Sequence, residues 1–112
     1  MISLEYLAGL VDGEGCIRLT QTNGGKQGGK LYYYPRLQVT NTFKPIIEEL
    51  QKEFGGGVRH SSSKNHPNWK DKYDWVADGD TARTILKQIV PYLRIKKDRA
   101  IEVLSLDQKV RA

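Results

Sequence analysis

Cysteine and long apolar stretches are almost absent from this 112-residue chain. Its single cysteine, Cys16, excludes an intramolecular disulfide and any cysteine-based zinc cluster. No apolar run approaches the roughly 20 residues that span a bilayer, so we expect no membrane partner. The amino-terminal stretch lacks the basic region of a signal peptide, and Glu5 argues against a transit sequence. We therefore expect one domain over residues 1–112 that works inside a cell, in the cytoplasm or nucleoid of a microbe or in an organelle matrix.

Acidic residues are fewer than basic ones. Eighteen Lys and Arg stand against thirteen Asp and Glu, which gives a net charge of +5 and an isoelectric point near 9.4. No Asp or Glu occurs between Gly15 and Ile47. An excess of positive charge in so short a chain favours a polyanionic partner, of which nucleic acid is the most common.

Hydrophobic spacing and turn residues predict helices and strands in the order αββαββαα. Ser3 is placed to cap the first helix, Gly13 and Gly15 to end it, and Gly55 to end the second. Pro35 predicts that its strand lies at a sheet edge or contains a bulge there. The expected helices cover residues 4–12, 44–54, 80–90 and 98–106, and the expected strands cover 16–22, 31–40, 57–62 and 72–77. This pattern predicts an α+β domain and leaves open which faces Tyr73 and Trp75 occupy.

The first two predicted strands alternate between apolar and polar residues, so each should bury one face and expose the other. The exposed faces combine residues that hydrogen-bond or stack: Arg18, Thr20, Thr22, Tyr32, Tyr34, Arg36, Gln38 and Thr40. Arg and Gln pair bidentately with guanine and adenine edges, and a two-stranded ribbon fits a major groove. An ordinary solvated face is the alternative, but the shortage of acidic residues in this region favours nucleic acid.

Two further motifs have plainer explanations. Gly24, Gly29 and Lys30 have the spacing of a phosphate-binding loop, but a strand follows where that loop requires a helix, and Leu31 replaces its Ser or Thr. A hairpin tip is therefore favoured, in which Lys26 and Lys30 could contact a phosphate backbone. The set His60, Asn65 and His66 suggests a metal site or a histidine nuclease, but no cysteine or acidic ligand accompanies it, so exposed loop histidines are favoured.

The stretch LAGLVDGEG places Asp12 and Glu14 where a helix ends. Acidic groups are unfavourable there, because a helix carboxyl end already carries about half a negative charge. Ala8, Gly9 and Gly13 form a strip of small residues that lets another helix approach closely. If that helix is the same one in a second chain, two Glu14 carboxylates converge, and a divalent cation between them would reverse the repulsion. Carboxylate, carbonyl and water oxygens are the ligands that Mg²⁺ prefers.

At this point the sequence resembles the LAGLIDADG homing endonucleases. YLAGLVDGEG is close to their defining motif, and LQVTN and PYLRIKK resemble further segments of the family. The resemblance implies homodimers whose motif helices pack at the two-fold axis, with curved antiparallel sheets that form a saddle on double-stranded DNA. It implies a site-specific endonuclease that cuts both strands at a long near-palindromic site, in the context of intron homing. The expected base-reading side chains are Arg18, Arg36, Gln38 and Arg59, with Ser61 as a further DNA contact.

The resemblance also implies roles at the active site. Glu14 is the metal-binding catalytic residue, and the backbone carbonyl of Gly13 joins it at the metal. Asn41 falls where a polar residue orders the hydrolytic water, Lys96 matches a basic residue beside the site, and Pro45 stands where the family carries another basic residue. Mg²⁺ is the expected cofactor, with Mn²⁺ as a substitute and Ca²⁺ as a non-productive ion, and no small-molecule cofactor is expected. The expected dimer interface comprises Leu7, Ala8, Gly9, Val11 and Asp12.

Three other interpretations remain open. Some relatives assist intron splicing, so the chain could be an RNA-binding maturase. It could also be a degenerate domain that binds DNA as a regulator. In the plainest interpretation, the first helix is a core helix and Asp12 and Glu14 are merely solvated. The presence of both Glu14 and Lys96 favours the enzyme.

Overall fold

The computed structural model describes residues 1–23, 31–61 and 71–109. It contains helices α1 (Leu4–Glu14), α2 (Lys44–Phe54), α3 (Gly79–Ile89) and α4 (Lys97–Lys109), with a short 3-10 helix, η1 (Val90–Tyr92). The strands are β1 (Gly15–Asn23), β2 (Leu31–Asn41), β3 (Gly57–Ser61) and β4 (Lys72–Asp78). The predicted order αββαββαα is therefore confirmed, with η1 inserted before the last helix. None of the helices in the described ranges has the length and hydrophobicity needed to cross a membrane.

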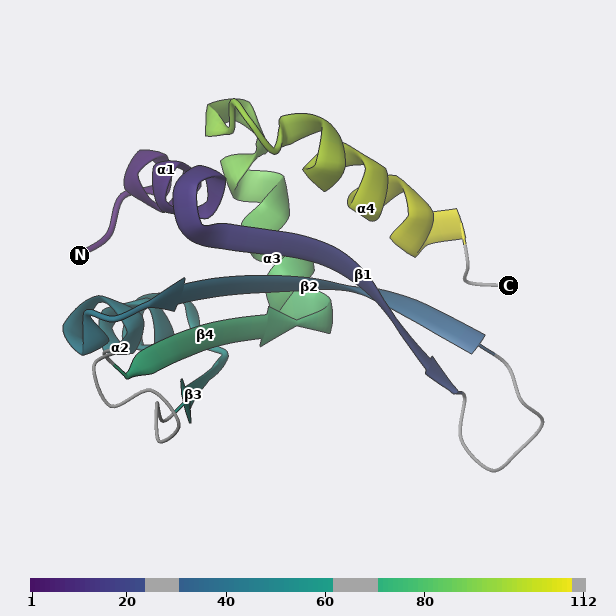
Figure 1. Ribbon diagram of the computed structural model, residues 1–112. Helices are drawn as coiled ribbons and strands as arrows, with labels where there is room; N and C mark the ends of the chain where they lie inside the picture. Colours follow the sequence, from purple (N-terminus) through teal and green to yellow (C-terminus); the bar gives the residue numbers. More distant parts are fainter. Residues whose placement is uncertain (24–30, 62–70, 110–112) are drawn as a thin grey trace.

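The strands form one antiparallel sheet in the order β1-β2-β4-β3. Figure 1 shows β1 and β2 as long, curved strands whose far ends extend beyond β4. Their register is continuous, from Gly15 opposite Val39 to Asn23 opposite Leu31. The curved antiparallel sheet predicted from the sequence is thus confirmed, and the fold is α+β.

The helices cover one face of this sheet, because the apolar residues of all four strands point to that side. Ile17, Leu37, Val39 and Ala77 are buried there, and Trp75 lies at the centre with no exposed surface. The Trp75 indole N–H donates to the carbonyl of Gly55 over 2.7 Å, which satisfies its one polar group. Helix residues complete the core: Leu7, Ala8, Val11, Ile47, Leu50, Ala82, Ile85, Leu86, Ile89, Ala100 and Val103.

Strand parity settles the faces of two aromatic residues. Tyr73 and Trp75 alternate with Lys72 and Asp74, so both aromatics lie on the helix side. Tyr73 stacks on the ring of His60, with 4.9 Å between centroids. His60 is thus a strand residue with a stacking partner, as the expected strand over residues 57–62 placed it, and not the loop histidine that the motif argument favoured.

Pro35 marks a local edge. It lies opposite Leu19 on β1, but β4 pairs with β2 only from Arg36 to Asn41. The missing N–H of proline therefore interrupts no hydrogen bond to β4. The register passes Pro35 without an extra residue, so the bulge is not observed. The prediction of an edge strand was also wrong, because β2 pairs with β1 on one side and with β4 on the other, and the pairing with β4 begins one residue after Pro35.

The first helix is longer than predicted. Gly13 and Glu14 both belong to α1, and the helix ends at Gly15, whose N–H donates to the carbonyl of Val11. Gly15 has extended backbone angles that any residue can adopt, so conformational freedom does not explain why glycine is needed there. A Cβ at Gly15 would lie 2.7 Å from the Cα of Val11, which means that β1 leaves α1 through a gap that only glycine fits.

Replacing Gly15 with alanine should lower the free energy of unfolding by about 1–3 kcal/mol, the usual effect of overpacking. The added methyl group would meet backbone atoms, which cannot rotate away as a side chain does. Urea unfolding of Gly15→Ala and Gly57→Ala provides the measurement. Gly57 also begins a strand, but a Cβ there meets no atom within 4 Å, so this control should not lose stability. Equal losses for the two variants would contradict the steric explanation.

Candidate functional site

The carboxylate of Glu14 lies at the exposed end of α1, against the end of β2. The side-chain amide of Asn41 donates a short hydrogen bond to Glu14 Oε2. The Asn41 carbonyl oxygen accepts the backbone N–H of Phe43 over 2.8 Å, which fixes the orientation of the amide. Glu14 and Asn41 share a surface hollow with Thr40, Thr42 and Lys72. Two residues from the predicted site, 27 positions apart, are thus brought into contact.

Asp12 points away from Glu14 and binds a distant segment. Its carboxylate accepts the backbone N–H groups of Arg94, Ile95 and Lys96 over 2.8, 3.2 and 2.9 Å. Partial desolvation raises the pKa of Asp12, but these three hydrogen bonds and the charge of Lys96 outweigh it, so the pKa lies below its usual value. Asp12 therefore joins the end of α1 to the segment that leads into α4.

Lys96 binds back to α1 through its side chain. Its ammonium group donates to the backbone carbonyls of Val11 and Asp12 over 3.1 and 2.7 Å. These carbonyls belong to the last turn of α1, where a helix leaves carbonyls without helical partners; the Val11 carbonyl also accepts the N–H of Gly15. A cation at this position offsets the negative end of the helix. The predicted basic residue is therefore beside the motif helix, one turn from Glu14.

A hard divalent cation fits the donors that this helix end offers. Glu14 supplies a carboxylate and Gly13 a backbone carbonyl, which are oxygen ligands of the kind Mg²⁺ prefers. Lys96 already bonds the two preceding carbonyls, so Gly13 is the next one along the helix end. Across residues 1–23, 31–61 and 71–109, no three His, Cys, Asp or Glu side chains gather as a metal-holding group. A cation here would need further ligands from outside the chain.

The predicted dimer interface needs a correction. Leu7, Ala8 and Val11 have no exposed surface, because α1 packs against the sheet, α3 and η1 of its own chain. Asp12 uses its carboxylate within the chain. The prediction failed because the same apolar stripe of α1 could form either the core or the dimer interface, and in the structure these residues belong to the core. Of the five predicted residues, Gly9 is the one that lies on the exposed side of α1.

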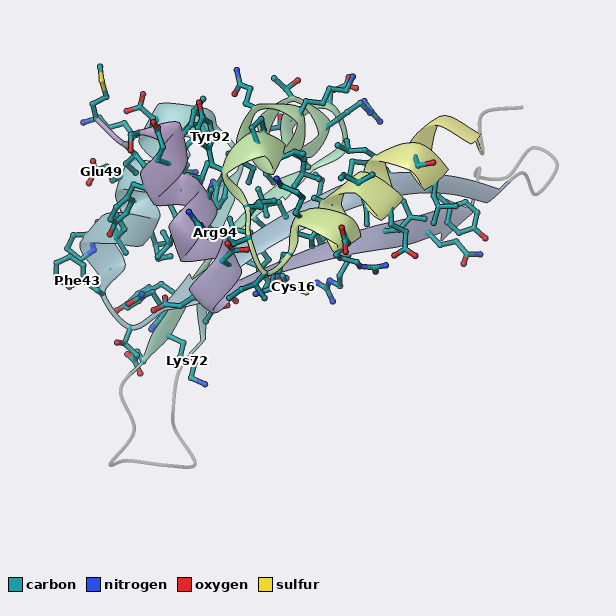
Figure 2. All side chains as sticks on the ribbon, turned by 90° about the horizontal axis from the view of Figure 1, so that it is seen from above. Cys16, Phe43, Glu49, Lys72, Tyr92 and Arg94 are labelled. Atoms are coloured by element: carbon teal, nitrogen blue, oxygen red, sulfur yellow. The ribbon has the colours of Figure 1, made fainter. Side chains whose placement is uncertain are left out.

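The outer side of α1 is open and flanked by exposed apolar groups. A Cβ built on Gly9 or Gly13 meets no atom within 4 Å. Gly9 and Asp12 line a surface hollow with Tyr92 and Arg94, and Figure 2 shows both of these labelled side chains beside α1. Tyr92 is 43% exposed and the nearby Ile95 is 76% exposed.

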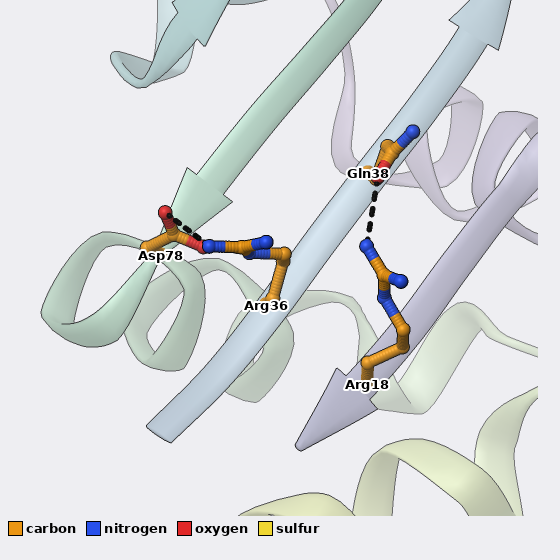
Figure 3. A network of polar contacts seen from close by, with 4 residues as sticks. All are labelled: Arg18, Arg36, Gln38 and Asp78. Carbon is orange, nitrogen blue, oxygen red and sulfur yellow. Dashed lines mark hydrogen bonds and ion pairs between the residues drawn. The ribbon is translucent and has the colours of Figure 1, made fainter. Parts of the chain in front are cut away.

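The face of the sheet opposite the helices is polar, as the alternation predicted. The described part of this face carries Arg18 and Thr20 from β1, Tyr34, Arg36, Gln38 and Thr40 from β2, and Arg59 from β3. Two acidic residues of β4, Asp74 and Asp78, join them, although the predicted face contained none. Asp74 accepts a hydrogen bond from Thr40, and Asp78 pairs with Arg36. Figure 3 shows Arg36 directed to Asp78 and Arg18 directed to Gln38.

Some of the predicted contact residues lie outside the part of the chain that the structure describes. Lys26 and Lys30 lie outside the described residues, as do Asn65 and His66. The backbones of Thr22, Tyr32 and Ser61 belong to β1, β2 and β3, but their side chains are outside the description.

Sequence reasoning missed three residues that the fold brings to the site. Lys72 shares the hollow of Glu14, and Asp74 and Asp78 lie on the polar face. The alternation of β4 contained a signal for them, since Lys72, Asp74, Val76 and Asp78 occupy one face. That signal identifies a face only after Trp75 is known to be buried.

Comparisons with known proteins agree with this architecture. A family model described as LAGLIDADG endonuclease matches residues 7–99. The DNA endonuclease I-CvuI of Chlorella vulgaris is 26% identical over 113 residues, which cover 97% of this chain and 66% of the relative. The chain therefore spans just under two thirds of the length of that protein.

Solved structures show the same fold. The homing endonuclease I-CvuI bound to the I-CreI target in the presence of Mg superposes with a TM-score of 0.75 at 28% identity, over 96% of this chain and 66% of the other. I-CvuI has also been crystallised with its own target in the presence of Ca. The archaeal intron-encoded homing endonuclease I-Vdi141I, complexed with DNA, has a TM-score of 0.69 at 16% identity, over 94% of this chain and 66% of the other, which shows the fold alone.

Asp12→Ala should lower the free energy of unfolding by about 1–3 kcal/mol, because three backbone N–H groups lose their acceptor. Urea unfolding provides the measurement. Glu53→Ala is the matched control, since Glu53 is also an acid in the last turn of a helix and is exposed. Removing that acid should leave stability unchanged or slightly raised. If both variants unfold at the same urea concentration, Asp12 does not hold the two segments together.

Proposed function

The chain belongs to the LAGLIDADG endonuclease family, and on that premise we propose that it is a divalent-metal-dependent endonuclease. Its substrate is double-stranded DNA with a long, near-palindromic target site, and it hydrolyses a phosphodiester bond in each strand. Residues 1–112 act as one endonuclease domain, and two copies of the chain form the active enzyme. A protein with this activity works where DNA is accessible, in the cytoplasm or nucleoid of a microbe or in an organelle matrix.

The observation that carries this proposal is the placement of Glu14. Its carboxylate lies at the exposed end of the motif helix, is bonded by Asn41, and shares a hollow with Lys72. Glu14 precedes β1 directly, so the carboxylate lies at the edge of the polar face on which DNA would rest. A solvated acid would need neither an oriented amide nor this position.

Glu14 and the carbonyl of Gly13 are the residues that would hold Mg²⁺, with Mn²⁺ as a substitute and Ca²⁺ as a non-productive ion. When bound, the metal supplies an activated water and stabilises the leaving oxygen. Asn41 orients Glu14 and has a second amide N–H that can position the attacking water. Lys96 reduces the repulsion between the negative end of α1 and the phosphate. Lys72 places a positive charge in the hollow, which offsets the absence of a basic residue at position 45, where this chain has proline.

A second chain would complete the site. Among the described residues, Glu14 is the one carboxylate that lines this hollow. Gly9 and Gly13 leave the outer side of α1 open to close approach. Two α1 helices packed there would bring two Glu14 residues together about a two-fold axis. The exposed Tyr92 and Ile95 would gain a covering surface in the same contact. The interface thus uses the side of α1 opposite to its buried Leu7, Ala8 and Val11.

The polar face is the proposed DNA-binding surface. Arg18, Arg36, Gln38 and Arg59 are the base-reading candidates, while Thr20, Tyr34 and Thr40 support them. Lys26 and Lys30 contact the phosphate backbone, and Thr22, Tyr32 and Ser61 extend the surface. Phosphate contacts position the protein, whereas base contacts specify the sequence. Curvature of β1 and β2 suits a duplex lying along them (Figure 1).

Glu14→Gln should abolish cleavage while leaving DNA binding largely intact. The amide removes a charged metal ligand, which should slow hydrolysis by at least about 100-fold. A random DNA library, screened with Mg²⁺ for cleaved products and with Ca²⁺ for bound duplexes, identifies the target site. The cleavage rates of the wild type and the variant are then measured on a duplex that contains this site. Glu53→Gln is the control with unchanged cleavage. Undiminished cleavage by Glu14→Gln would remove the catalytic assignment. Binding of RNA without any DNA site would favour the maturase, and binding of DNA without cleavage would favour a regulator.

Gly9→Arg should leave the single chain folded and prevent its dimerisation. A side chain at this position enters open space in one chain but would block a second α1. Sedimentation at assay concentration, with and without DNA, measures the assembly. Thr84→Arg on the exposed part of α3 is the control, since it adds the same group elsewhere on the surface. A wild-type monomer on DNA, or a Gly9→Arg dimer, would contradict the proposed interface.

A further inference from the structure

Two arginines of the polar face lie directly opposite one another. Arg18 on β1 is the register partner of Arg36 on β2. Like charges in such a cross-strand pair repel. The side chains separate toward different partners, as Figure 3 shows: Arg36 extends to Asp78 on β4, and Arg18 extends to Gln38.

The contact with Asp78 changes what Arg36 offers to a ligand. Arg36 Nε donates to Asp78 Oδ1 over 2.6 Å, and a second guanidinium nitrogen donates to Oδ2 over 3.4 Å. These two bonds use donors that a free arginine would direct at phosphates or at guanine. The Arg36 side chain is 26% exposed, so solvent screens the pair only in part. A DNA base that meets Arg36 also meets the carboxylate of Asp78.

The other arginine, Arg18, pairs with a neutral amide and not with a carboxylate. Arg18 donates to the side-chain oxygen of Gln38 over 3.1 Å. This bond uses one of the two lone pairs of the Gln38 oxygen, so Gln38 is less available for the paired acceptor and donor contact that recognises adenine. Arg18 keeps further N–H donors, which match the two acceptors of guanine. The two arginines thus present different sets of donors and acceptors on the polar face.

Resting on the proposed function, we propose that Asp78 is a specificity-determining residue of the DNA-binding face. It holds Arg36 away from Arg18 and places a carboxylate where the acceptors of guanine would lie. Guanine is therefore disfavoured at the position that Arg36 reaches and favoured at the position that Arg18 reaches. Asp78 also withholds Arg36 from phosphates, so the position contributes to sequence discrimination more than to general affinity.

The affected base pair can be located approximately. Arg36 lies four residues along β2 from Thr40, which lines the hollow of Glu14. At about 3.4 Å per residue this is about 14 Å, or about four base pairs along a duplex. A change at Asp78 should therefore act about four base pairs from the position nearest Glu14 and leave the central base pairs unaffected.

The test compares sites selected from a random duplex library by the wild-type 112-residue chain, Asp78→Asn and Asp80→Asn, with Ca²⁺ present. Asp80 is the matched control, since it is an exposed aspartate paired with Arg83 on α3, away from the sheet face. In Asp78→Asn, the preference for guanine at the Arg36 position should rise about 10-fold. The logarithm of the non-specific binding constant should fall more steeply with the logarithm of salt concentration, by about one unit of slope, because Arg36 becomes free to contact a phosphate.

Two further variants secure the interpretation. Asp78 precedes α3 without a capping hydrogen bond from its side chain, and Asp78→Ser keeps a residue suited to that position while being too short to reach Arg36. This variant should show the same shift. In an Arg36→Gln background, Asp78→Asn should have no further effect on base preference, because Asp78 acts through Arg36.

The outcomes separate the two proposals. If the wild type selects no duplex site, the proposed DNA function itself fails. If the wild type selects a site and both Asp78 variants select the same one as Asp80→Asn, the function stands and the role of Asp78 is overturned. A shift that persists in the Arg36→Gln background also overturns it, because Asp78 then acts without Arg36.

Discussion

The end of α1 is held to the segment before α4 by an exchange of hydrogen bonds in both directions. Asp12 accepts three backbone N–H groups of residues 94–96, and Lys96 donates to two carbonyls of the last turn of α1. Without these bonds, two acidic side chains and several unpaired carbonyls would meet at the negative end of a helix dipole. The exchange compensates Asp12 and the helix end, so Glu14 alone keeps an available carboxylate. The candidate site depends on this division of labour between two acids two residues apart.

The same principle of local compensation governs the polar face of the sheet. Arginines opposed across β1 and β2 are stable together because β4 contributes Asp78 and β2 contributes Gln38 as separate partners. The face is therefore not uniformly basic, even though its first two strands contain no acidic residue. A surface that mixes cations with fixed acceptors suits discrimination among bases better than simple attraction to phosphates.

Local signals predicted much of this protein. The apolar spacing of residues 44–54 and the glycine after them define α2 with its observed bounds. Alternation in β1 and β2 correctly separated buried Ile17 and Leu37 from the polar Arg18 and Arg36. The motif identified Glu14, and the order of elements identified the fold. Prediction failed where one pattern allows two uses: the apolar stripe of α1 suited both a core and an interface, and only packing against the sheet decided between them.

The sequence by itself determined the elements, the polar and apolar faces of β1 and β2, and the residue types at the motif, because these follow from short-range spacing and backbone chemistry. Tertiary structure alone decided the partners. Asp12 meets Lys96 across 84 positions, Asn41 meets Glu14 across 27, and Arg36 meets Asp78 across 42. No local pattern encodes contacts between residues so far apart in the sequence. They arise from the strand order β1-β2-β4-β3 and from the turn of the chain that returns residues 94–96 to α1. The candidate catalytic acid, Glu14, was visible in the sequence; the contacts that Asp12 makes with residues 94–96 and that Asp78 makes with Arg36 were not.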